Sequence, residues 1–237
     1  MSGRPPVLIA VLGATASGKS ALALALAERY GGEIISCDSA AVYRRFDIGT
    51  DKVPTAERRG IPHHLIDVAE PSDDYTAARF GRAAAAVARG VAARGRQPIL
   101  AGGTGFYFRA LTRGLFPGPG RDAALRVEAQ FRRGLVDEAR ALLASGIPAT
   151  ARPFGSLGYR QVLQHLRGER GESETRELIV RETRQYARRQ LIWFRKEPNL
   201  DSIPGPGELP SAIAAACRVI DRRIGTLEAG AGGEETA

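Results

Sequence analysis

The sequence contains little that would direct the chain to a membrane, a secretory route or a metal cluster. It has no uninterrupted run of about 18 apolar residues, the length of a membrane-spanning helix, and it begins without the long apolar segment of a secretory signal. Its two cysteines, Cys37 and Cys217, lie far apart and match no metal-ligand spacing. We therefore expect a cytoplasmic protein with reduced thiols and no membrane partner.

The composition provides ample material for a folded core. At 237 residues and 43% hydrophobic content, the chain suits one large domain or a domain with an appendage. The net charge of +8 is uneven, with its basic excess densest in residues 121–200 and an acidic excess in residues 201–237. Nearly all the cations are arginine. The positive charge therefore has two equally good explanations, binding of a polyanion such as RNA or an arginine-rich proteome.

Short apolar segments alternate with helical patterns through the first half of the chain. Strands are expected at VLIAVL (7–12), EIIS (33–36), HLIDV (64–68) and PILAGG (98–103), with helices between them. This alternation predicts an α/β fold, a parallel sheet flanked by helices. From Arg121 onward the periodicity is mainly helical.

The stretch GATASGKS, Gly13 to Ser20, lies between the first expected strand and an Ala/Leu-rich helix. The spacing G-x-x-x-x-G-K-S lets backbone N–H groups surround an anion at a helix N-terminus, while Lys19 adds charge and Ser20 is a possible magnesium ligand. The context predicts a P-loop NTPase-like sheet that binds phosphate. The pattern by itself does not specify a reaction.

Two further segments follow expected strand ends. Asp38 and Ser39 follow the second strand, where a carboxylate can ligate magnesium or take a proton, although a turn or helix cap suits these residues better on local grounds. Thr104, in GGTGFYF, offers a hydroxyl among glycines that allow close approach of a ligand. Asp67 is a weak candidate for a magnesium-holding aspartate, and a metal shared by His63 and His64 is not expected.

A later basic helix, ETRQYARRQLIWFR, places Arg184, Arg188 and Arg195 on roughly one face. Such a row can clamp a diphosphate or an RNA backbone, or it can be a solvated basic face. Trp193 fits the core, with base stacking as the alternative.

Taken in order, GATASGKS, DSAAVYRRFDIGTDK, PHHLID, GGTGFYFRAL, GYR and RRQLIWFR closely resemble the tRNA dimethylallyltransferase family, also called isopentenylpyrophosphate:tRNA transferases. The likeness runs from about Val7 to Pro198. It implies transfer of a prenyl group from dimethylallyl diphosphate to the exocyclic amine of the adenosine 3′ of a tRNA anticodon, by a protein that we expect to be a monomer.

The resemblance also implies roles for individual residues. Asp38 would act as general base, with Thr104 and Arg184 at the same site, and Ser20 would lie near magnesium. The diphosphate would be held by Gly13, Ala14, Thr15, Ala16, Ser17, Gly18, Lys19 and Ser20. The tRNA would contact Asp38, Ser39, Ala40, Ala41, Gly158, Tyr159, Arg160, Arg188, Arg189, Gln190, Trp193 and Arg195.

Two departures from the family pattern stand out. Ala41 occupies a position where the family usually has Gln, and the chain is shorter than family members because most of a helical insertion that grips the anticodon stem-loop is absent. We therefore divide the chain into a core (1–120), a reduced helical insertion (121–150), C-terminal helices packing on the core (151–225) and a disordered tail (226–237).

Three other functions remain open from the sequence. A relative that prenylates free adenylate would not need the missing insertion, although the retained GYR and RRQLIWFR segments oppose it. A small-molecule P-loop kinase would need ATP turnover. A non-catalytic RNA-binding remnant would have no need of Lys19, Ser20, Asp38 and Thr104.

Overall fold

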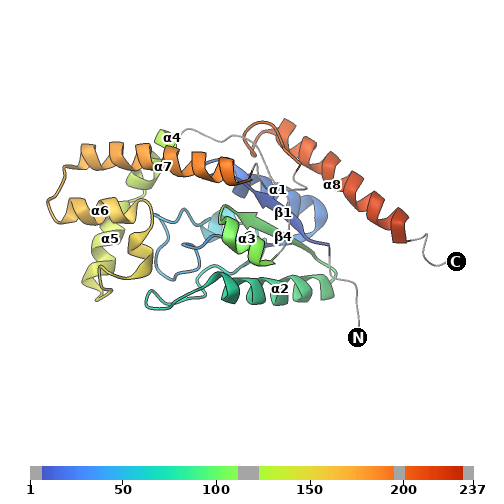
Figure 1. Ribbon diagram of the computed structural model, residues 1–237, viewed down its shortest axis with the longest axis horizontal. Coiled ribbons are helices and arrows are strands. Elements are labelled where there is room, and N and C mark those ends of the chain that lie inside the picture. The colour runs from blue at the N-terminus through green and yellow to red at the C-terminus, as the bar shows by residue number, and fades with distance from the viewer. Residues whose placement is uncertain (1–6, 112–122, 195–200, 232–237) are drawn as a thin grey trace.

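The computed structural model describes residues 7–111, 123–194 and 201–231 (Figure 1). Its centre is a parallel four-stranded sheet with the strand order β1-β4-β2-β3. The strands are β1 (Ile9–Leu12), β2 (Gly32–Cys37), β3 (His63–His64) and β4 (Gln97–Gly102). Leu12 and Cys37 both pair in register with Gly102, so β1, β2 and β4 end at the same level. Their carboxyl ends form one edge of the sheet. Loops that leave this edge are positioned to form a site.

Alternate strand residues pack on opposite faces of the sheet. Ile34 and Ile99 join the cluster that contains α1 (Lys19–Tyr30) and α8 (Pro210–Ala231), whereas Ile35 and Leu100 join the larger cluster on the other face. The second face is covered by α2 (Ala77–Ala93) and α3 (Gly105–Leu111). Burial on both faces explains why Ile34 and Ile35 in β2, and Ile99 and Leu100 in β4, are consecutive apolar residues.

A helical lobe follows in the chain and lies to one side of the sheet (Figure 1). It consists of α4 (Ala123–Arg132), α5 (Leu135–Ala144), the 3₁₀ turn η2 (Arg152–Gly155), α6 (Tyr159–Leu166) and α7 (Glu172–Phe194); an earlier 3₁₀ turn, η1, spans Thr55–Glu57. Helix α7 packs on α4 and α6 and extends to contact α3. It therefore connects the lobe to the edge of the sheet where the strands end.

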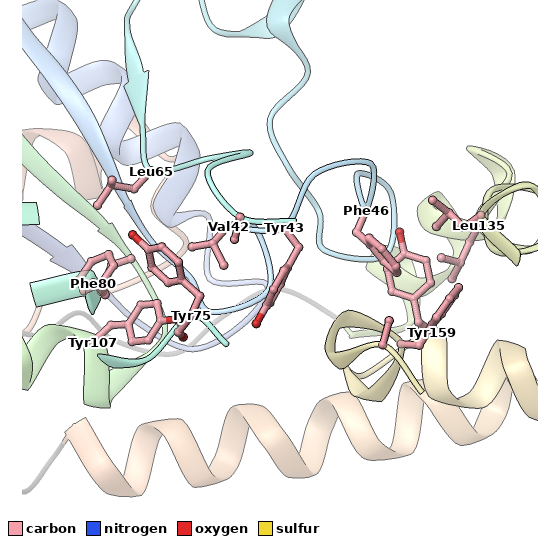
Figure 2. Close-up of a cluster of buried hydrophobic side chains, with 14 of the residues drawn as sticks. Val42, Tyr43, Phe46, Leu65, Tyr75, Phe80, Tyr107, Leu135 and Tyr159 are labelled. Carbon is pink, nitrogen blue, oxygen red and sulfur yellow. Dashed lines mark hydrogen bonds between the residues drawn. The ribbon is translucent and has the colours of Figure 1, made fainter. Parts of the chain in front are cut away.

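The larger core cluster continues from the sheet into the lobe (Figure 2). Next to the sheet, the rings of Phe80 and Tyr107 stack with centroids 4.3 Å apart. In the lobe, Phe46 meets the ring of Tyr159 edge-on at 5.1 Å. Figure 2 shows Tyr43 between these two groups, so the segment that follows β2 lies along one continuous core.

The third expected strand is much shorter than predicted. Only His63 and His64 pair with β2, and the prediction of a strand through Val68 is wrong. Leu65 and Asp67 adopt left-handed backbone conformations, with φ of 60° and 56°, which a strand does not accommodate. The Asp67 carboxylate instead accepts a hydrogen bond from Lys52 Nζ at 2.6 Å, and Asp67 is not among the residues that line the cavities beside the phosphate loop.

The end of the described chain also differs from expectation. Helix α8 includes residues 226–231, which were expected to be disordered, whereas residues 232–237 lie outside the described part. The helix is docked on α1, where Tyr30 donates a hydrogen bond to Asp221 Oδ1 at 2.7 Å. Among the helices described, none is both long and apolar enough to cross a membrane.

Candidate active site

The phosphate loop connects β1 to α1, as its sequence predicts. Ala16 and Gly18 have φ values of 64° and 73°, and these left-handed residues turn the chain so that α1 begins at Lys19. Gly13 N–H donates to Gly102 O at 3.3 Å, which ties the start of the loop to the end of β4. Backbone N–H groups at the first turn of the 12-residue helix α1 therefore face the edge where the strands end.

Lys19 is the partly buried cation of this loop. Its Nζ donates to Ala14 O at 3.1 Å. Burial lowers the pKa of Lys19 to about 8, and the nearby carboxylate of Asp38 acts in the opposite direction. A buried ammonium is costly without a matching anion, so this position favours binding of a negatively charged ligand.

Two cavities meet at the phosphate loop. The inner cavity, of about 100 Å³, is lined by residues that include Thr15, Lys19, Ser20 and Asp38. The outer cavity, of about 810 Å³, shares Lys19 and Ser20 with the inner one and opens beside Ser17 and Gly18. The loop predicted to bind phosphate and the carboxylate predicted to take a proton thus border one space.

Asp38 lies beside the phosphate loop although the two segments follow different strands. Strand β4 lies between β1 and β2, so the strands that precede the phosphate loop and Asp38 are not neighbours. All three strands end in register, however, which still brings the two segments together. Asp38 Oδ1 accepts from Ala40 N at 2.8 Å and from Ala41 N at 3.3 Å. The turn role that local sequence favoured is therefore present, and Asp38 also lines the inner cavity.

Thr104 fixes the segment that follows Asp38. Its Oγ1 accepts from Ser39 N at 3.0 Å, and its own N–H donates to Cys37 O at 3.2 Å. These contacts hold the ends of β2 and β4 together beside the phosphate loop. A side chain on Gly102 would come within 2.1 Å of Cys37 O, so only glycine permits this approach.

Gln190, which the family resemblance assigned to tRNA, has its side chain buried between two loops. Its Oε1 accepts from Thr15 N at 2.7 Å, and its Nε2 donates to Gly103 O at 2.9 Å. With 8% of the residue exposed, these two bonds satisfy its side chain. Gln190 therefore links α7 to both the phosphate loop and the Thr104 segment, a role that the sequence did not reveal.

Tyr159, also assigned to tRNA, is completely buried. Its ring packs on Phe46, and its hydroxyl donates to Glu138 and accepts from Gly49 N at 3.2 Å. Glu138 Oε1 in turn accepts from Ile48 N at 3.0 Å. In this structure the Tyr159 side chain does not reach the surface and instead supports the loop at residues 47–52, part of which lines the cavities.

The remaining residues assigned to tRNA are placed as follows. Ala41 is 5% exposed, and Arg160 forms an ion pair with Glu182. Gly158 has a φ of 100° and starts α6, as only glycine does readily. Ser39 and Ala40 lie in the turn after Asp38, and Arg188 and Arg189 are exposed on α7. Arg195 and the side chain of Trp193 lie outside the described residues.

Arg184 does not line either cavity at the phosphate loop. Together with Arg181 and Arg188 it lines a groove of about 810 Å³ between α4 and α7. The sequence reasoning also missed Arg126 and Asp51, which line both cavities at the phosphate loop. Asp51 lies within the matched segment DSAAVYRRFDIGTDK but was given no role, and Arg126, which lies in none of the matched motifs, reaches the cavity through the packing of α4.

Comparison with known proteins identifies the family. A family model described as IPP transferase matches residues 41–125 and 120–197. The chain belongs to the IPP transferase family. Among curated relatives, a tRNA dimethylallyltransferase from Solibacter usitatus is 38% identical over 304 aligned residues, covering 92% of this chain and 99% of the relative. A tRNA dimethylallyltransferase 1 from Trichlorobacter lovleyi is 35% identical, with 90% and 98% covered.

Solved structures agree with this assignment. The full-length tRNA isopentenylpyrophosphate transferase from Bacillus halodurans superposes with a TM-score of 0.85 at 27% identity, covering 98% of this chain and 100% of that one. The predicted α/β, P-loop NTPase-like fold class is confirmed, as is the predicted family.

This IPP transferase is a short member of its family. Its alignment with the Solibacter relative spans 304 residues, more than the 237 of the whole chain, so the relative has residues without a counterpart here. The two matches to the family model meet at residues 120–125, directly before and at the start of α4. The match of this chain to the family model is therefore interrupted near the start of α4.

Proposed function

We propose that this chain is a tRNA dimethylallyltransferase, which transfers a dimethylallyl group from dimethylallyl diphosphate to the exocyclic amine of the adenosine 3′ of a tRNA anticodon. The observation that supports this proposal most directly is that Lys19 of the phosphate loop and Asp38 line the same cavity. One group suits the leaving diphosphate and the other suits the proton of the attacking amine. The names of the curated relatives support the same activity.

The reaction forms a bond from the adenine N6 to C1 of the dimethylallyl group and breaks the bond from C1 to the diphosphate oxygen. Negative charge grows on that oxygen as the bond breaks. The ammonium of Lys19 and the backbone N–H groups of the loop stabilise it, because they are already oriented before the reaction. The N–H groups of Gly13 and Thr15 are not among them, since they donate to Gly102 O and to Gln190 Oε1. Asp38 accepts the proton that the amine loses.

An aromatic amine is a weak nucleophile, so holding it against the allylic carbon must supply much of the rate. Correct positioning of two reactants can be worth roughly 7–11 kcal/mol. The bonds from Thr104 to Ser39 and from Gln190 to Thr15 and Gly103 fix the walls of the cavity relative to one another. These residues therefore support the orientation of both substrates.

A magnesium ion fits this arrangement. The Ser20 hydroxyl and the Asp38 carboxylate supply oxygen donors in the wall of one cavity, the kind of ligand that magnesium prefers. No group of three or more His, Cys, Asp or Glu residues able to hold a metal occurs in the described parts of the chain, which suits an ion held mainly by diphosphate and water. When bound, magnesium would neutralise charge on the diphosphate.

We propose that tRNA binds across the edge of the sheet that carries Ser39 and Ala40, with the exposed arginines of α7 contacting its phosphates. Arg188 and Arg189 are exposed there, and the groove between α4 and α7 adds Arg181. We propose a monomer as the active unit, because the phosphate loop and Asp38 of a single chain border one cavity. We also propose that the enzyme acts in the cytoplasm, because its proposed substrate is tRNA.

Two alternatives differ in their acceptor. Free adenylate would fit a chain that lacks part of the tRNA-gripping insertion, and a kinase would use ATP at the phosphate loop. A direct test incubates the protein and labelled dimethylallyl diphosphate with unmodified tRNA, with AMP, and with neither. Label in tRNA alone supports the proposal, label in AMP supports the adenylate enzyme, and ADP formation from ATP with a phosphorylated acceptor supports a kinase.

A further inference from the structure

Tyr186 is an aromatic residue of α7 that the proposed mechanism does not use. It lies one helical turn before Gln190, so the two side chains share one face of the helix. From that face Gln190 reaches Thr15 N and Gly103 O. Tyr186 therefore lies on the side of α7 that faces the phosphate loop and the segment around Thr104.

The charges that act on Tyr186 are those of the candidate site. Burial raises the pKa of Tyr186, the carboxylate of Asp38 raises it further, and Arg126 and Arg189 lower it. Asp38 and Arg126 both line the inner cavity. The Tyr186 hydroxyl is thus within electrostatic reach of the carboxylate that is proposed to take the proton of the attacking amine.

The ring of Tyr186 is held in place but remains open to solvent. The residue is 36% exposed, whereas Tyr75, Tyr107 and Tyr159 are buried in the core. The guanidinium carbon of Arg189 lies 5.8 Å from the centroid of the Tyr186 ring, within the range of a cation–π contact. This contact restricts the orientation of the ring and places a positive charge beside it.

The proposed reaction needs an aromatic surface at this place. The amine that Asp38 deprotonates belongs to an adenine of the anticodon loop, and a base that reacts in a protein pocket must leave the stack of its neighbours. An aromatic side chain can replace the lost stacking, because every base has a π face. An arginine beside the ring suits the phosphate of the same nucleotide.

We propose that Tyr186 binds the acceptor base, with its ring stacked on the adenine so that the exocyclic amine lies beside Asp38, while Arg189 contacts the adjoining phosphate. The inference rests on the proposed function in that it takes the acceptor to be a base of RNA. Stacking fixes the plane of the base, so Tyr186 contributes both to affinity and to the orientation of the nucleophile.

The test compares two anticodon stem-loops, one with adenosine 3′ of the anticodon and one with an abasic ribose at that position. Tyr186→Leu removes the ring and keeps an apolar side chain. It should weaken binding of the adenosine stem-loop roughly 5- to 150-fold, the effect of losing the stacking of one base, and should leave binding of the abasic stem-loop unchanged. Tyr186→Phe keeps the ring and should bind both stem-loops as the wild type does.

Ile192→Ala is the matched control. Ile192 is an exposed apolar residue of the same helix, about 120° around the helix axis from Tyr186, and its replacement should leave both affinities unchanged. If Tyr186 has only a structural role, Tyr186→Leu weakens binding of the two stem-loops alike. That result, or an unchanged affinity for the adenosine stem-loop, overturns the inference. A thermal unfolding curve for each variant checks that affinities are measured on folded protein.

The outcome is separable from the proposed function. Stem-loop binding that depends on both Tyr186 and the adenine, in a protein that transfers no prenyl group, would leave this inference standing and refute the reaction. Prenyl transfer to tRNA with equal stem-loop binding by the wild type and Tyr186→Leu would do the reverse. AMP binding is measured with the same variants, and a loss confined to AMP would overturn the assignment of the ring to RNA.

Discussion

Asp38 combines a structural and a chemical role in one carboxylate. Its Oδ1 accepts hydrogen bonds from Ala40 N and Ala41 N, which closes the turn after β2. Within the described parts of the chain, no donor bonds its Oδ2, and the residue lines the inner cavity. An asparagine at this position keeps an oxygen for the turn and loses the ability to take a proton.

Asp38→Asn should therefore reduce prenyl transfer by about 100- to 10,000-fold, the usual contribution of a general base. Its melting temperature and its affinity for inorganic pyrophosphate should remain close to those of the wild type. Single-turnover kinetics with labelled dimethylallyl diphosphate measure the loss. Near-normal turnover in a folded variant would remove Asp38 from its role as base.

Lys19 makes diphosphate binding depend on pH. Its pKa of about 8 lies below the usual 10.5 because the side chain is buried. Below pH 8 the free protein carries the ammonium and binds the anion fully, whereas above pH 8 a growing fraction is neutral and binds it less well. Pyrophosphate affinity should thus fall as the pH rises through 8, and a Lys19→Met variant should bind weakly without this step. An affinity that is flat from pH 6 to 9 in the wild type would refute the assignment.

The sequence predicted single residues well where a local motif fixes them. Lys19, Asp38 and Thr104 follow strand ends whose positions could be read from short apolar segments, and all three lie where those strands end. Gln190 and Tyr159 were assigned to tRNA because they lie in matched motifs, yet both side chains are buried. Whether these two side chains are buried depends on how α6 and α7 pack, and this packing cannot be read from local sequence patterns.

At the level of elements, α7 determines how the two halves of the site are joined. This helix of 23 residues packs on α4 and α6 in the lobe and delivers Gln190 to the phosphate loop. The Gln190 side-chain amide packs closely against Gly103, because a side chain on Gly103 would come within 2.6 Å of Gln190 Nε2. The phosphate loop and the Thr104 segment therefore keep a fixed separation only while α7 is docked.

Gln190→Leu keeps the volume but leaves Thr15 N and Gly103 O without their partner. We expect a loss of about 1–3 kcal/mol in the free energy of unfolding for each buried group left unpaired, and a lower kcat for prenyl transfer. Affinity for an anticodon stem-loop should stay within about twofold, less than the loss of a single net hydrogen bond. Denaturant unfolding and stem-loop binding measure both effects. A stable variant with weakened stem-loop binding would restore Gln190 as an RNA contact.

Elements were predicted better than their arrangement. Helices α1, α2 and α7 could be predicted from the periodicity of their own residues, without knowledge of distant contacts. The insertion of β4 between β1 and β2 was not predictable, because parallel strands with helical crossovers can be ordered in several ways. Strand β3 was overestimated, since its apolar run ends in left-handed turns held by Lys52.

At the level of the whole molecule, the residues that are missing near the start of α4 change which surfaces can bind tRNA. Relatives carry residues that are missing near positions 120–125, so the surfaces that remain for an anticodon stem-loop lie on the core and on α7. Exposed arginines contact phosphates without reading bases, and each neutralised phosphate releases counterions. Binding that rests on such contacts depends strongly on salt.

We therefore expect stem-loop affinity to fall steeply as salt rises. Replacing Arg181 and Arg188 together by alanine should weaken binding to different tRNA sequences alike. It should also reduce the slope of log affinity against log salt by about 0.7 to 0.9 for each RNA phosphate that the variant no longer neutralises. Affinities measured at several salt concentrations, for the wild type and the double variant, give both numbers. A flat salt response would favour free adenylate as the acceptor.

The central claim is that this short chain prenylates one base of tRNA through the cavity shared by Lys19 and Asp38. Its most direct test treats unmodified tRNA with the wild type and dimethylallyl diphosphate, digests the product with nuclease and locates the added group by mass spectrometry. We expect one dimethylallyl group on the adenosine 3′ of the anticodon with the wild type, and almost none with Asp38→Asn. Unmodified tRNA beside prenylated AMP in a parallel reaction, or equal modification by the variant, would contradict it.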